Sequence, residues 1–274
     1  MNKEIRTGDA YVSVYSDQFS SRIRIDDYSG PLTSVLKIIE NEKSAWVEKL
    51  IFKSRPQDVE LLESKGFINE ARVNDYFLGT DMFFMTKYFS SERQKSLAWD
   101  EEELIVNTII KEEVNAYETD ISNVRVASKD DCKDLADLYR DVFPIYPTPL
   151  SDPNHLEKTM EEGTVYVFIR DHEKMVSAAS AEINSTYKNA ELTDCASRHE
   201  AQGKGHMKKL LYKLEERLVH RGVHCLYTIA RAQSVGMNKA FHQLGYHYGG
   251  RLKKNLIIYS GLEDMNVWYK MSKL

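Results

Sequence analysis

Two glycines stand at the start of a helix-forming segment, where they can serve phosphate binding. The sequence Gln202-Gly203-Lys204-Gly205-His206-Met207 follows a strand-like run and precedes leucines that recur at helical spacing. Glycine in the first turn of a helix costs about 1 kcal/mol relative to alanine, so the pair needs a compensating gain. Unpaired amides and the positive end of the helix dipole at such a turn hold a phosphate or pyrophosphate. On spacing alone, a plain strand-to-helix turn remains the alternative.

The same stretch resembles the acyl-CoA pyrophosphate loop of the GNAT N-acetyltransferase superfamily, which reads Gln-x-x-Gly-x-[Gly/Ala] between a strand and a helix. Gln202 and Gly205 match, and Met207 departs, because the family places a small residue there. The resemblance implies an α/β GNAT fold, acetyl-CoA as co-substrate, and acetyl transfer to an amine. No metal is expected, because His199, His206, His220 and His224 share no metal-ligand spacing. The methionine loosens the expected cofactor contact but leaves the amide donors in place.

The resemblance implies two further contacts with acetyl-CoA. The backbone of Cys195, Ala196 and Ser197, directly before the loop, would pair with the pantetheine arm as an added strand. Asn238 stands where the family commonly has an asparagine that hydrogen-bonds the pantetheine. The alternative for Asn238 is an ordinary residue in the first turn of a helix.

Phe241 stands where the family often has a tyrosine that protonates the departing sulfur. Phenylalanine has no proton to give, so Phe241 is expected to contact the cofactor but not to act as the general acid. A thiol with a pKa of about 8.5 can leave unaided. Otherwise His242, Tyr246 or a tyrosine from another loop replaces the missing hydroxyl.

Three carboxylates on strand-like runs beside the loop are candidates for a general base. An amine acceptor with a pKa of about 10 arrives charged and must lose a proton before it attacks. The candidates are Glu191, Asp194 and Glu182. Glu191 resembles the general-base glutamate of histone-type members, which share Ala-Glu followed by Cys-Ala. A regular strand would turn Asp194 to the face opposite Glu191, and each carboxylate has the alternative of a strand-edge charge in water.

The C-terminal part of the chain predicts the elements that position these residues. Residues 121–274 read as β-α-α-β-β-β-α-β-α-β-β, the order expected of a GNAT domain. The predicted strands are 123–127, 164–170, 175–184, 190–196 and 224–230, with final strands near 256–259 and 266–270. The predicted helices are 129–142, 156–161, the segment after the glycine loop, and 235–244.

Residues 1–89 predict a smaller α/β domain, and 90–120 predict a helical linker. Two strands are expected in 11–28, a helix near 32–39, a strand at 45–53, a helix at 57–64, and apolar strand-like runs at 73–78 and 82–88. The segment 50–67 parallels 226–246, since both read strand, polar break, helix, glycine and aromatic residue. We therefore hypothesise a degenerate half of the GNAT fold, with chance similarity as the alternative.

This first domain is expected to lack a CoA site. It has Ser29-Gly30-Pro31 where the second has the glycine loop, and proline removes an amide that a phosphate would need. The domain would close one side of the substrate cleft or form a subunit interface, as in a homodimer.

Several strings in both parts of the chain resemble the β-lysine N6-acetyltransferases. They include Tyr76-Phe77-x-Gly79-x-Asp81, Glu191-x-Thr193-Asp194 and Asn238-Lys239-x-Phe241. The resemblance implies acetylation of the ε-amine of β-lysine to Nε-acetyl-β-lysine, a compatible solute. Arg251 is a candidate clamp for the substrate carboxylate, alongside Arg231 and Arg198. Tyr146 lies in the loop that commonly lines the acceptor pocket.

Composition limits the other classes of function. A formal charge of -5 without a basic tract argues weakly against nucleic acid. The three cysteines lack metal-ligand spacing and fit a reducing cytoplasm. Residues 1–16 lack an apolar signal-peptide core, and no run of about 18 apolar residues could span a membrane. The remaining alternatives are another diamine, a polyamine or a protein lysine as acceptor, or a CoA-binding sensor without catalysis.

Overall fold

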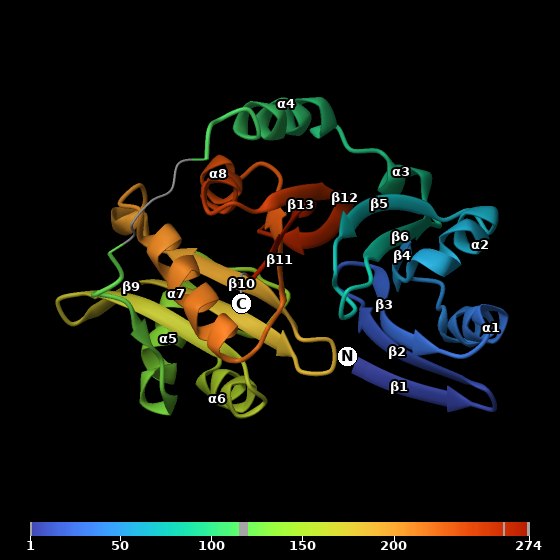
Figure 1. Ribbon diagram of the computed structural model, residues 1–274, viewed down its shortest axis with the longest axis horizontal. Coiled ribbons are helices and arrows are strands. Elements are labelled where there is room, and N and C mark those ends of the chain that lie inside the picture. The colour runs from blue at the N-terminus through green and yellow to red at the C-terminus, as the bar shows by residue number, and fades with distance from the viewer. Residues whose placement is uncertain (1, 115–119, 260, 273–274) are drawn as a thin grey trace.

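The computed structural model describes residues 2–114, 120–259 and 261–272, and their strands form a single sheet (Figure 1). The strands are β1 Asn2–Thr7, β2 Ala10–Asp17, β3 Arg22–Ser29, β4 Lys49–Ser54, β5 Ile68–Val73, β6 Met82–Tyr88, β7 Arg125–Val126, β8 Val165–Asp171, β9 Lys174–Asn184, β10 Asn189–Ser197, β11 Cys225–Arg231, β12 His247–Ile258 and β13 Gly261–Met271. The α-helices are α1 Leu32–Glu42, α2 Val59–Ser64, α3 Ser91–Gln94, α4 Trp99–Ile109, α5 Cys132–Val142, α6 Pro153–Glu161, α7 His206–His220 and α8 Val235–Gln243. Short 3-10 helices are Pro56–Asp58, Lys129–Asp131 and His199–Ala201. Residues 115–119 of the predicted linker, and positions 1, 260 and 273–274 of the predicted domains, lie outside the described residues.

The sheet consists of two halves that repeat one strand order. Its order is β1-β2-β3-β4-β6-β5-β12-β13-β11-β10-β9-β8-β7. β3 pairs in parallel with β4, as β10 does with β11. β4 pairs antiparallel with β6, and β11 pairs antiparallel with β13. Strands β1–β6 and β8–β13 therefore share one topology, and the two halves meet at β5 and β12. Figure 1 shows the N-terminal half on the right and the C-terminal half on the left.

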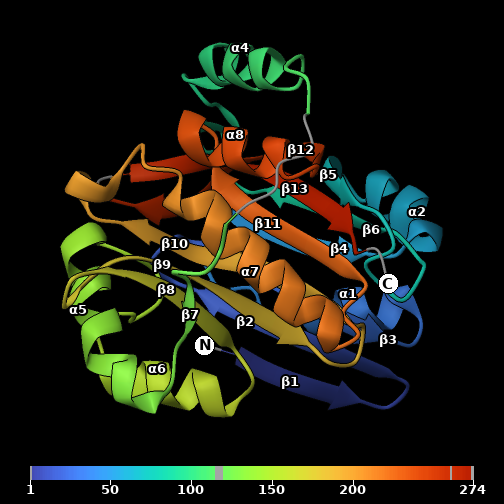
Figure 2. The same cartoon turned by 60° about the vertical axis from the view of Figure 1, so that its left-hand side comes forward.

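Helices cover both faces of the C-terminal half because each presents an apolar stripe to the strands. Alternate residues of a strand point to opposite faces. One face of β8 packs under α7, and the other packs under α5 and α6 (Figure 2). The leucines of α7 are fully buried, as their helical spacing predicts: Leu210, Leu211, Leu214 and Leu218. Each such burial contributes about 1.5–3 kcal/mol.

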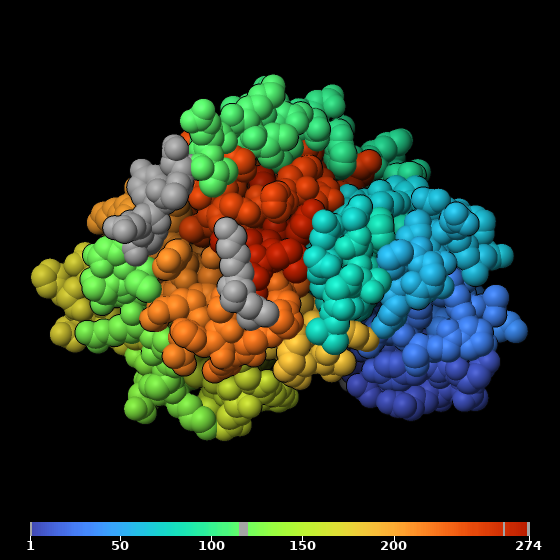
Figure 3. All heavy atoms as spheres, in the orientation of Figure 1, coloured from blue at the N-terminus to red at the C-terminus, as the bar shows by residue number. Residues whose placement is uncertain are grey.

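The two halves join where β5 and β12 approach closely, and this approach requires glycine. Ala71 pairs with Gly250 across the junction. A Cβ atom at Gly250 would lie 2.4 Å from the carbonyl oxygen of Glu70, and Gly250 has a φ of +133°. A Cβ atom at Gly249 would lie 2.2 Å from the carbonyl oxygen of Arg72. Any side chain here would separate the two halves, which lie against each other in Figure 3.

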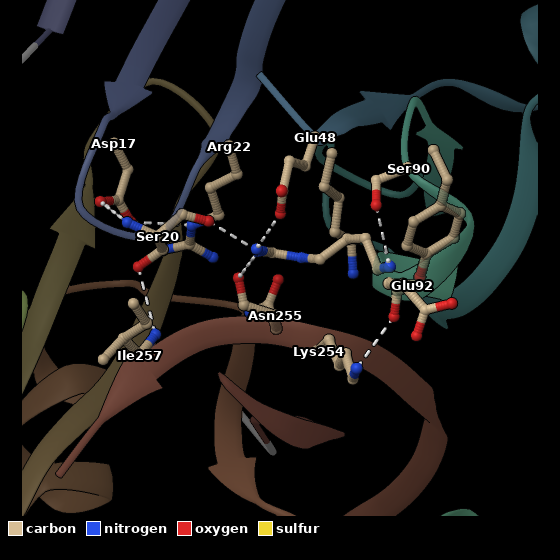
Figure 4. Close-up of polar contacts among 12 residues, drawn as sticks. Asp17, Ser20, Arg22, Glu48, Ser90, Glu92, Lys254, Asn255 and Ile257 are labelled. Carbon is tan, nitrogen blue, oxygen red and sulfur yellow. Dashed lines mark hydrogen bonds and ion pairs between the residues drawn. The ribbon is translucent and has the colours of Figure 1, made fainter. Parts of the chain in front are cut away.

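A buried arginine also connects the halves. Arg93 of α3 donates from Nη2 to the carbonyl oxygens of Ser20, at 2.7 Å, and Asn255, at 3.3 Å. Its Nη1 donates to Oε2 of Glu48 at 3.4 Å. Ser20 Oγ in turn accepts the amide of Ile257 at 3.2 Å. Figure 4 shows Asn255 and Ile257 on one side of this cluster and Ser20 and Glu48 on the other. The cluster holds β12 against the N-terminal half, since losing it would leave buried carbonyl groups unpaired.

Arg251 of β12 holds α4 over the sheet, and this position contradicts its predicted role as a substrate clamp. Its side chain has no exposed surface. It donates to the carbonyl oxygen of Trp99 at 2.8 Å and to Oε2 of Glu103 at 2.6 Å. It also donates to Asn266 Oδ1 at 3.1 Å. A guanidinium enclosed in this way cannot reach a ligand.

The predicted order of C-terminal elements is confirmed. In the N-terminal half, β1 is an additional strand, and the strand expected at 73–78 is wrong, because β5 ends at Val73. Asp75 and Leu78 take left-handed φ values of 54° and 52°, which form a turn instead. Among the described helices, none has the length and apolar character needed to cross a bilayer.

Candidate active site

β10 and β11 separate part-way along their length and leave a cavity between them. Their parallel pairing covers only Asn189–Glu191 and Cys225–Tyr227. Beyond these pairs, most of residues 192–197 and all of 228–231 line a cavity of about 620 Å³. Separated strand edges expose backbone N–H and C=O groups, with which an extended ligand can pair as an added strand.

A β-bulge turns Asp194 toward this cavity. The pairing of β10 with β9 shifts between Thr193 and Ala196, and Asp194 has a φ of 50°. Ser180 lies opposite Thr193 in the ladder, so its side chain shares the face of Thr193 and of Glu191. Asp194 accepts a hydrogen bond from Ser180 Oγ at 2.6 Å and therefore lies on that face too. The expectation that Asp194 and Glu191 face opposite sides is wrong because the strand is not regular.

Two hydroxyl groups hold the Asp194 carboxylate. Tyr146, from the loop between α5 and α6, donates to Oδ1 at 3.1 Å, and Ser180 donates to Oδ2. Burial raises the pKa of Asp194 to about 6, and the two hydrogen bonds oppose this rise. Burial and the nearby Asp194 carboxylate also raise the pKa of Tyr146 well above its ordinary value. Asp194 is thus ionised at neutral pH and basic enough to accept a proton, while Tyr146 keeps its own.

The glycine loop forms one end of the same cavity. Gly203 and Gly205 have φ values of +74° and +75°, a left-handed conformation that glycine adopts at little cost. Gly205 is the N-cap of α7, which begins at His206. His206 Nδ1 lies 3.1 Å from Ser177 Oγ. The first-turn amides of α7 have no intrahelical acceptors, and the helix dipole adds a partial positive charge, which suits an anionic group.

A second cavity, of about 430 Å³, lies between the two halves of the molecule. Glu191 and Glu182 are cross-strand neighbours on β10 and β9, and both line this second cavity. Tyr227 of β11 donates to Glu191 Oε2 at 2.9 Å. The wall of the second cavity that belongs to the N-terminal half comes from β2, β3 and β4. It carries four charged residues: Arg24, Asp26, Asp27 and Lys53.

The pKa of Glu182 is raised to about 7 in this cavity. Burial is the largest cause, followed by the negative charges of Glu191 and Asp194. Arg24 and Lys53 act in the opposite direction. Three carboxylates, on β9 and β10, therefore gather on one face of the sheet, with Asp194 in the first cavity and the two glutamates in the second.

Comparisons with known proteins identify the chain. Residues 132–246 match the Acetyltransferase (GNAT) family. The N-acetyltransferase YodP of Bacillus subtilis is 36% identical, over 98% of this chain and 99% of its own. The chain belongs to the GNAT acetyltransferase family. A β-lysine N(6)-acetyltransferase of Methanococcus maripaludis is 34% identical over 100% of both chains, and one from Methanosarcina mazei is 33% identical over 81% and 91%. A solved N-acetyltransferase from Staphylococcus aureus is 16% identical, with a TM-score of 0.49, over 56% of this chain and 100% of its own.

The protein is thus an N-acetyltransferase, and enzymes of this family use acetyl-CoA. Most of the residues predicted to serve this GNAT chemistry line the first cavity. They are Tyr146, Asp194, Cys195, Ser197, Gln202, Gly203, Gly205, His206, Met207 and Phe241. Phe241 is fully buried and packs edge-on against Tyr246, with ring centroids 5.1 Å apart. Of the groups considered as replacements for a tyrosine at 241, Tyr146 lines the cavity, whereas His242 bonds the carbonyl oxygen of Glu112.

Asn238 of the acetyltransferase has a structural role and is not placed at the cavity. Its side chain is fully buried. Nδ2 donates to the carbonyl oxygens of Arg231, at 2.9 Å, and Ser234, at 2.8 Å. Oδ1 accepts from Trp268 Nε1 at 2.8 Å and from Asn266 at 2.9 Å. Asn238 therefore fastens α8 to β11 and β13, which contradicts the predicted direct bond to pantetheine. Ala196 and Lys204 are likewise not among the lining residues.

The sequence did not reveal the opposite wall of the acetyltransferase cavity. Residues Thr228, Ile229, Ala230 and Arg231 form it, because β11 parts from β10 after Tyr227. The sequence predicted the strand at 224–230 that forms this wall. It could not predict that this strand separates from β10, because strand separation depends on the tertiary structure. The charged residues of β3 and β4 in the second cavity were also missed.

Proposed function

We propose that this acetyltransferase transfers the acetyl group of acetyl-CoA to the ε-amine of β-lysine, giving Nε-acetyl-β-lysine, a compatible solute. Two relatives that match both halves of the chain at 34% and 33% identity are named for this activity. The observation that carries the proposal is Asp194, a buried carboxylate with a pKa of about 6 in the gap between β10 and β11. A base of that strength beside an open strand edge suits an amine acceptor and a thioester donor.

Acetyl-CoA would enter the first cavity along its length. Its pyrophosphate would rest on the amides of 203–207 at the start of α7. Its pantetheine arm would run along the open edge of β10 at 195–197. The thioester would then lie near the bulge, beside Asp194 and Tyr146.

The reaction is a direct transfer within the ternary complex. Asp194 takes a proton from the ammonium group of the acceptor, and the neutral amine attacks the thioester carbonyl carbon. As the carbon–sulfur bond breaks, Tyr146 gives its proton to the departing sulfur and regains one from Asp194. The Asp194 carboxylate, freed of that proton, then accepts the second proton of the attacking nitrogen and releases it to solvent, which leaves a neutral amide. The hydrogen bond between Tyr146 and Asp194, 3.1 Å long, supports this relay. Tyr146 thereby serves the role that Phe241 lacks.

We also propose that residues 1–89 form a degenerate half of the GNAT fold without a CoA site, joined through 90–120 to the domain at 121–274. The shared strand order of β1–β6 and β8–β13 supports this proposal. In place of a glycine loop, α1 has Pro31 as its N-cap and no side-chain cap. The three unpaired cysteines fit a reducing cytoplasm as the site of action.

A direct assay tests the function. The protein is incubated with acetyl-CoA and, separately, β-lysine, α-lysine, spermidine, putrescine and a lysine-bearing peptide, while free thiol and product mass are followed together. Selective turnover of β-lysine is the expected result. Preferred turnover of another amine would contradict the acceptor assignment, and cofactor binding without acetyl transfer to any amine would favour a sensor.

A further inference from the structure

Arg24 and Glu191 occupy the same register position in the two halves of the sheet. Glu191 lies beside Tyr227 in the parallel pair of β10 and β11. Arg24 lies beside Ile51 in the parallel pair of β3 and β4. Each of these is the third pair of its parallel ladder, in strands that hold the same place in the repeated strand order, and both residues line the second cavity. The repeat thus places a cation in the N-terminal half where the C-terminal half has a carboxylate.

The N-terminal wall of this cavity carries two cations for one shared carboxylate. Arg24 donates to Asp26 from Nε at 2.6 Å and from Nη2 at 3.1 Å. Lys53 Nζ lies 2.9 Å from the same Asp26 and donates to Tyr76 Oη at 3.2 Å. The other acid of this wall, Asp27, pairs with Arg55 at 3.0 Å. One positive charge of the Arg24 and Lys53 pair is therefore not neutralised by Asp26.

The C-terminal wall carries the opposite charge. Glu191 and Glu182 lie side by side across the β9 and β10 ladder. Glu191 acts on the far wall as well, because its carboxylate helps to raise the pKa of Arg24 against the effect of burial, together with Asp26. A ligand that bears both a carboxylate and an ammonium group would match the two walls at once.

We propose that the second cavity binds the amino-acid end of the acceptor, with its carboxylate at Arg24 and Lys53 and its non-reacting ammonium group at Glu191 and Glu182. This inference rests on the proposed function and names the residues that select the substrate. The N-terminal half thereby becomes part of the acceptor site.

The spacing along β10 fits a long diamino acid. Glu191 and Asp194 are three residues apart on one strand and on one face, so their Cα atoms are at most about 10 Å apart. A six-carbon diamino acid held at Glu191 by one ammonium group can extend past Thr193 and present its terminal amine to Asp194. Shorter diamines that lack a carboxylate would forgo the contacts with Arg24 and Lys53.

Truncated acceptors and matched variants test each contact. β-Lysine is compared with 1,4-diaminopentane, which lacks the carboxylate, and with 6-aminohexanoate, which lacks the β-amine. Arg24→Gln should lower the ratio of kcat/KM for β-lysine to that for 1,4-diaminopentane roughly 10- to 100-fold, the range of one charge-assisted hydrogen bond. Arg72→Gln is the control, because Arg72 is a half-exposed residue of β5 paired with Asp81, outside both cavities. Glu191→Gln should instead lower the ratio of β-lysine to 6-aminohexanoate, with the exposed Glu63→Gln as control.

The outcomes separate the inference from the function on which it rests. If wild type acetylates β-lysine but Arg24→Gln and Arg72→Gln show the same acceptor ratios, the inference is overturned and the function stands. If wild type acetylates none of the three compounds, the acceptor assignment falls, and the inference with it. Equal thermal shifts of all variants with acetyl-CoA establish that they are folded. If Arg24→Gln does not fold, the wild-type protein still tests the carboxylate contact. Equal wild-type kcat/KM values for β-lysine and 1,4-diaminopentane would contradict it.

Discussion

Tyr146 donates a hydrogen bond to Asp194 from a loop 48 residues earlier in the chain, and this contact joins the acceptor loop to the bulge of β10. The phenol and the carboxylate lie in the cavity that also contains the glycine loop. Burial keeps the proton on Tyr146 and makes Asp194 more basic. The pair can therefore both accept a proton from an amine and return one to a thiolate.

Asp194→Asn should lower kcat about 100- to 10,000-fold, the usual contribution of a general base. The amide cannot accept the proton, although its size preserves the contacts with Tyr146 and Ser180. The pH profile of wild-type kcat/KM should fall on the acid side of a pKa near 6. Glu182→Gln and Glu191→Gln, measured in parallel, should keep that acid limb. If either glutamate variant loses the limb and Asp194→Asn retains it, the base has been misassigned.

The same substitution should stabilise the protein at high pH. The pKa of Asp194 is raised from 3.8 to about 6 in the folded state, so folding favours its protonated form. That contribution is present below pH 3.8 and is lost as the pH rises through 6. Each pKa unit is worth about 1.4 kcal/mol, so the ionised group costs on the order of 3 kcal/mol. Thermal unfolding should show Asp194→Asn with a higher Tm than wild type at pH 8 and an equal Tm at pH 4, and a lower Tm at pH 8 would refute this.

Tyr146→Phe should lower kcat and shift the acid limb of the pH profile upward. The hydrogen bond from Tyr146 lowers the pKa of Asp194, so its removal should raise that pKa above 6. Loss of the proton donor should reduce kcat about 100-fold, within the usual range for acid–base groups. Tyr212→Phe, at an exposed site on α7, is the control. An unchanged kcat would contradict the role of Tyr146 as proton donor, and an unchanged acid limb would contradict its effect on the pKa of Asp194.

Gly205→Ala should weaken acetyl-CoA binding. Gly205 has a φ of +75°, and alanine would pay about 1–2 kcal/mol there or turn the first amides of α7 away from the phosphate. Gly222→Ala is a matched control, because Gly222 has a φ of +69° beyond the other end of the same helix. Both variants should lose similar stability in thermal unfolding, but only Gly205→Ala should raise the Kd for acetyl-CoA in calorimetry. Equal Kd values would mean that the loop amides do not hold the cofactor.

The glycine loop could be predicted from the sequence because its signals are local. Left-handed φ values at Gly203 and Gly205 and the leucine spacing of α7 depend on neighbouring residues. The position of Asp194 could not be predicted, since a bulge depends on how β10 pairs with β9. Alternation along a regular strand would instead place Asp194 on the face opposite Glu191.

Residues with distant partners were misjudged for a similar reason. Asn238 accepts a hydrogen bond from Trp268, and Arg251 donates one to Glu103. These partners lie far away in the sequence, so the family pattern at positions 238 and 251 could not show that both side chains are buried. The second cavity combines Arg24 with Glu191, which are far apart in the strand order. Their meeting in one cavity is a tertiary property that no local pattern in the sequence encodes.

The position of the acetyl group on the product decides whether the ε-amine of β-lysine is the acceptor. Wild-type protein, acetyl-CoA and β-lysine are incubated, and the product is fragmented in a tandem mass spectrometer. We expect one acetyl group per molecule, on the ε-nitrogen, formed together with one equivalent of free CoA. Acetylation of the β-amine, or no product while α-lysine or putrescine is acetylated, would contradict this expectation.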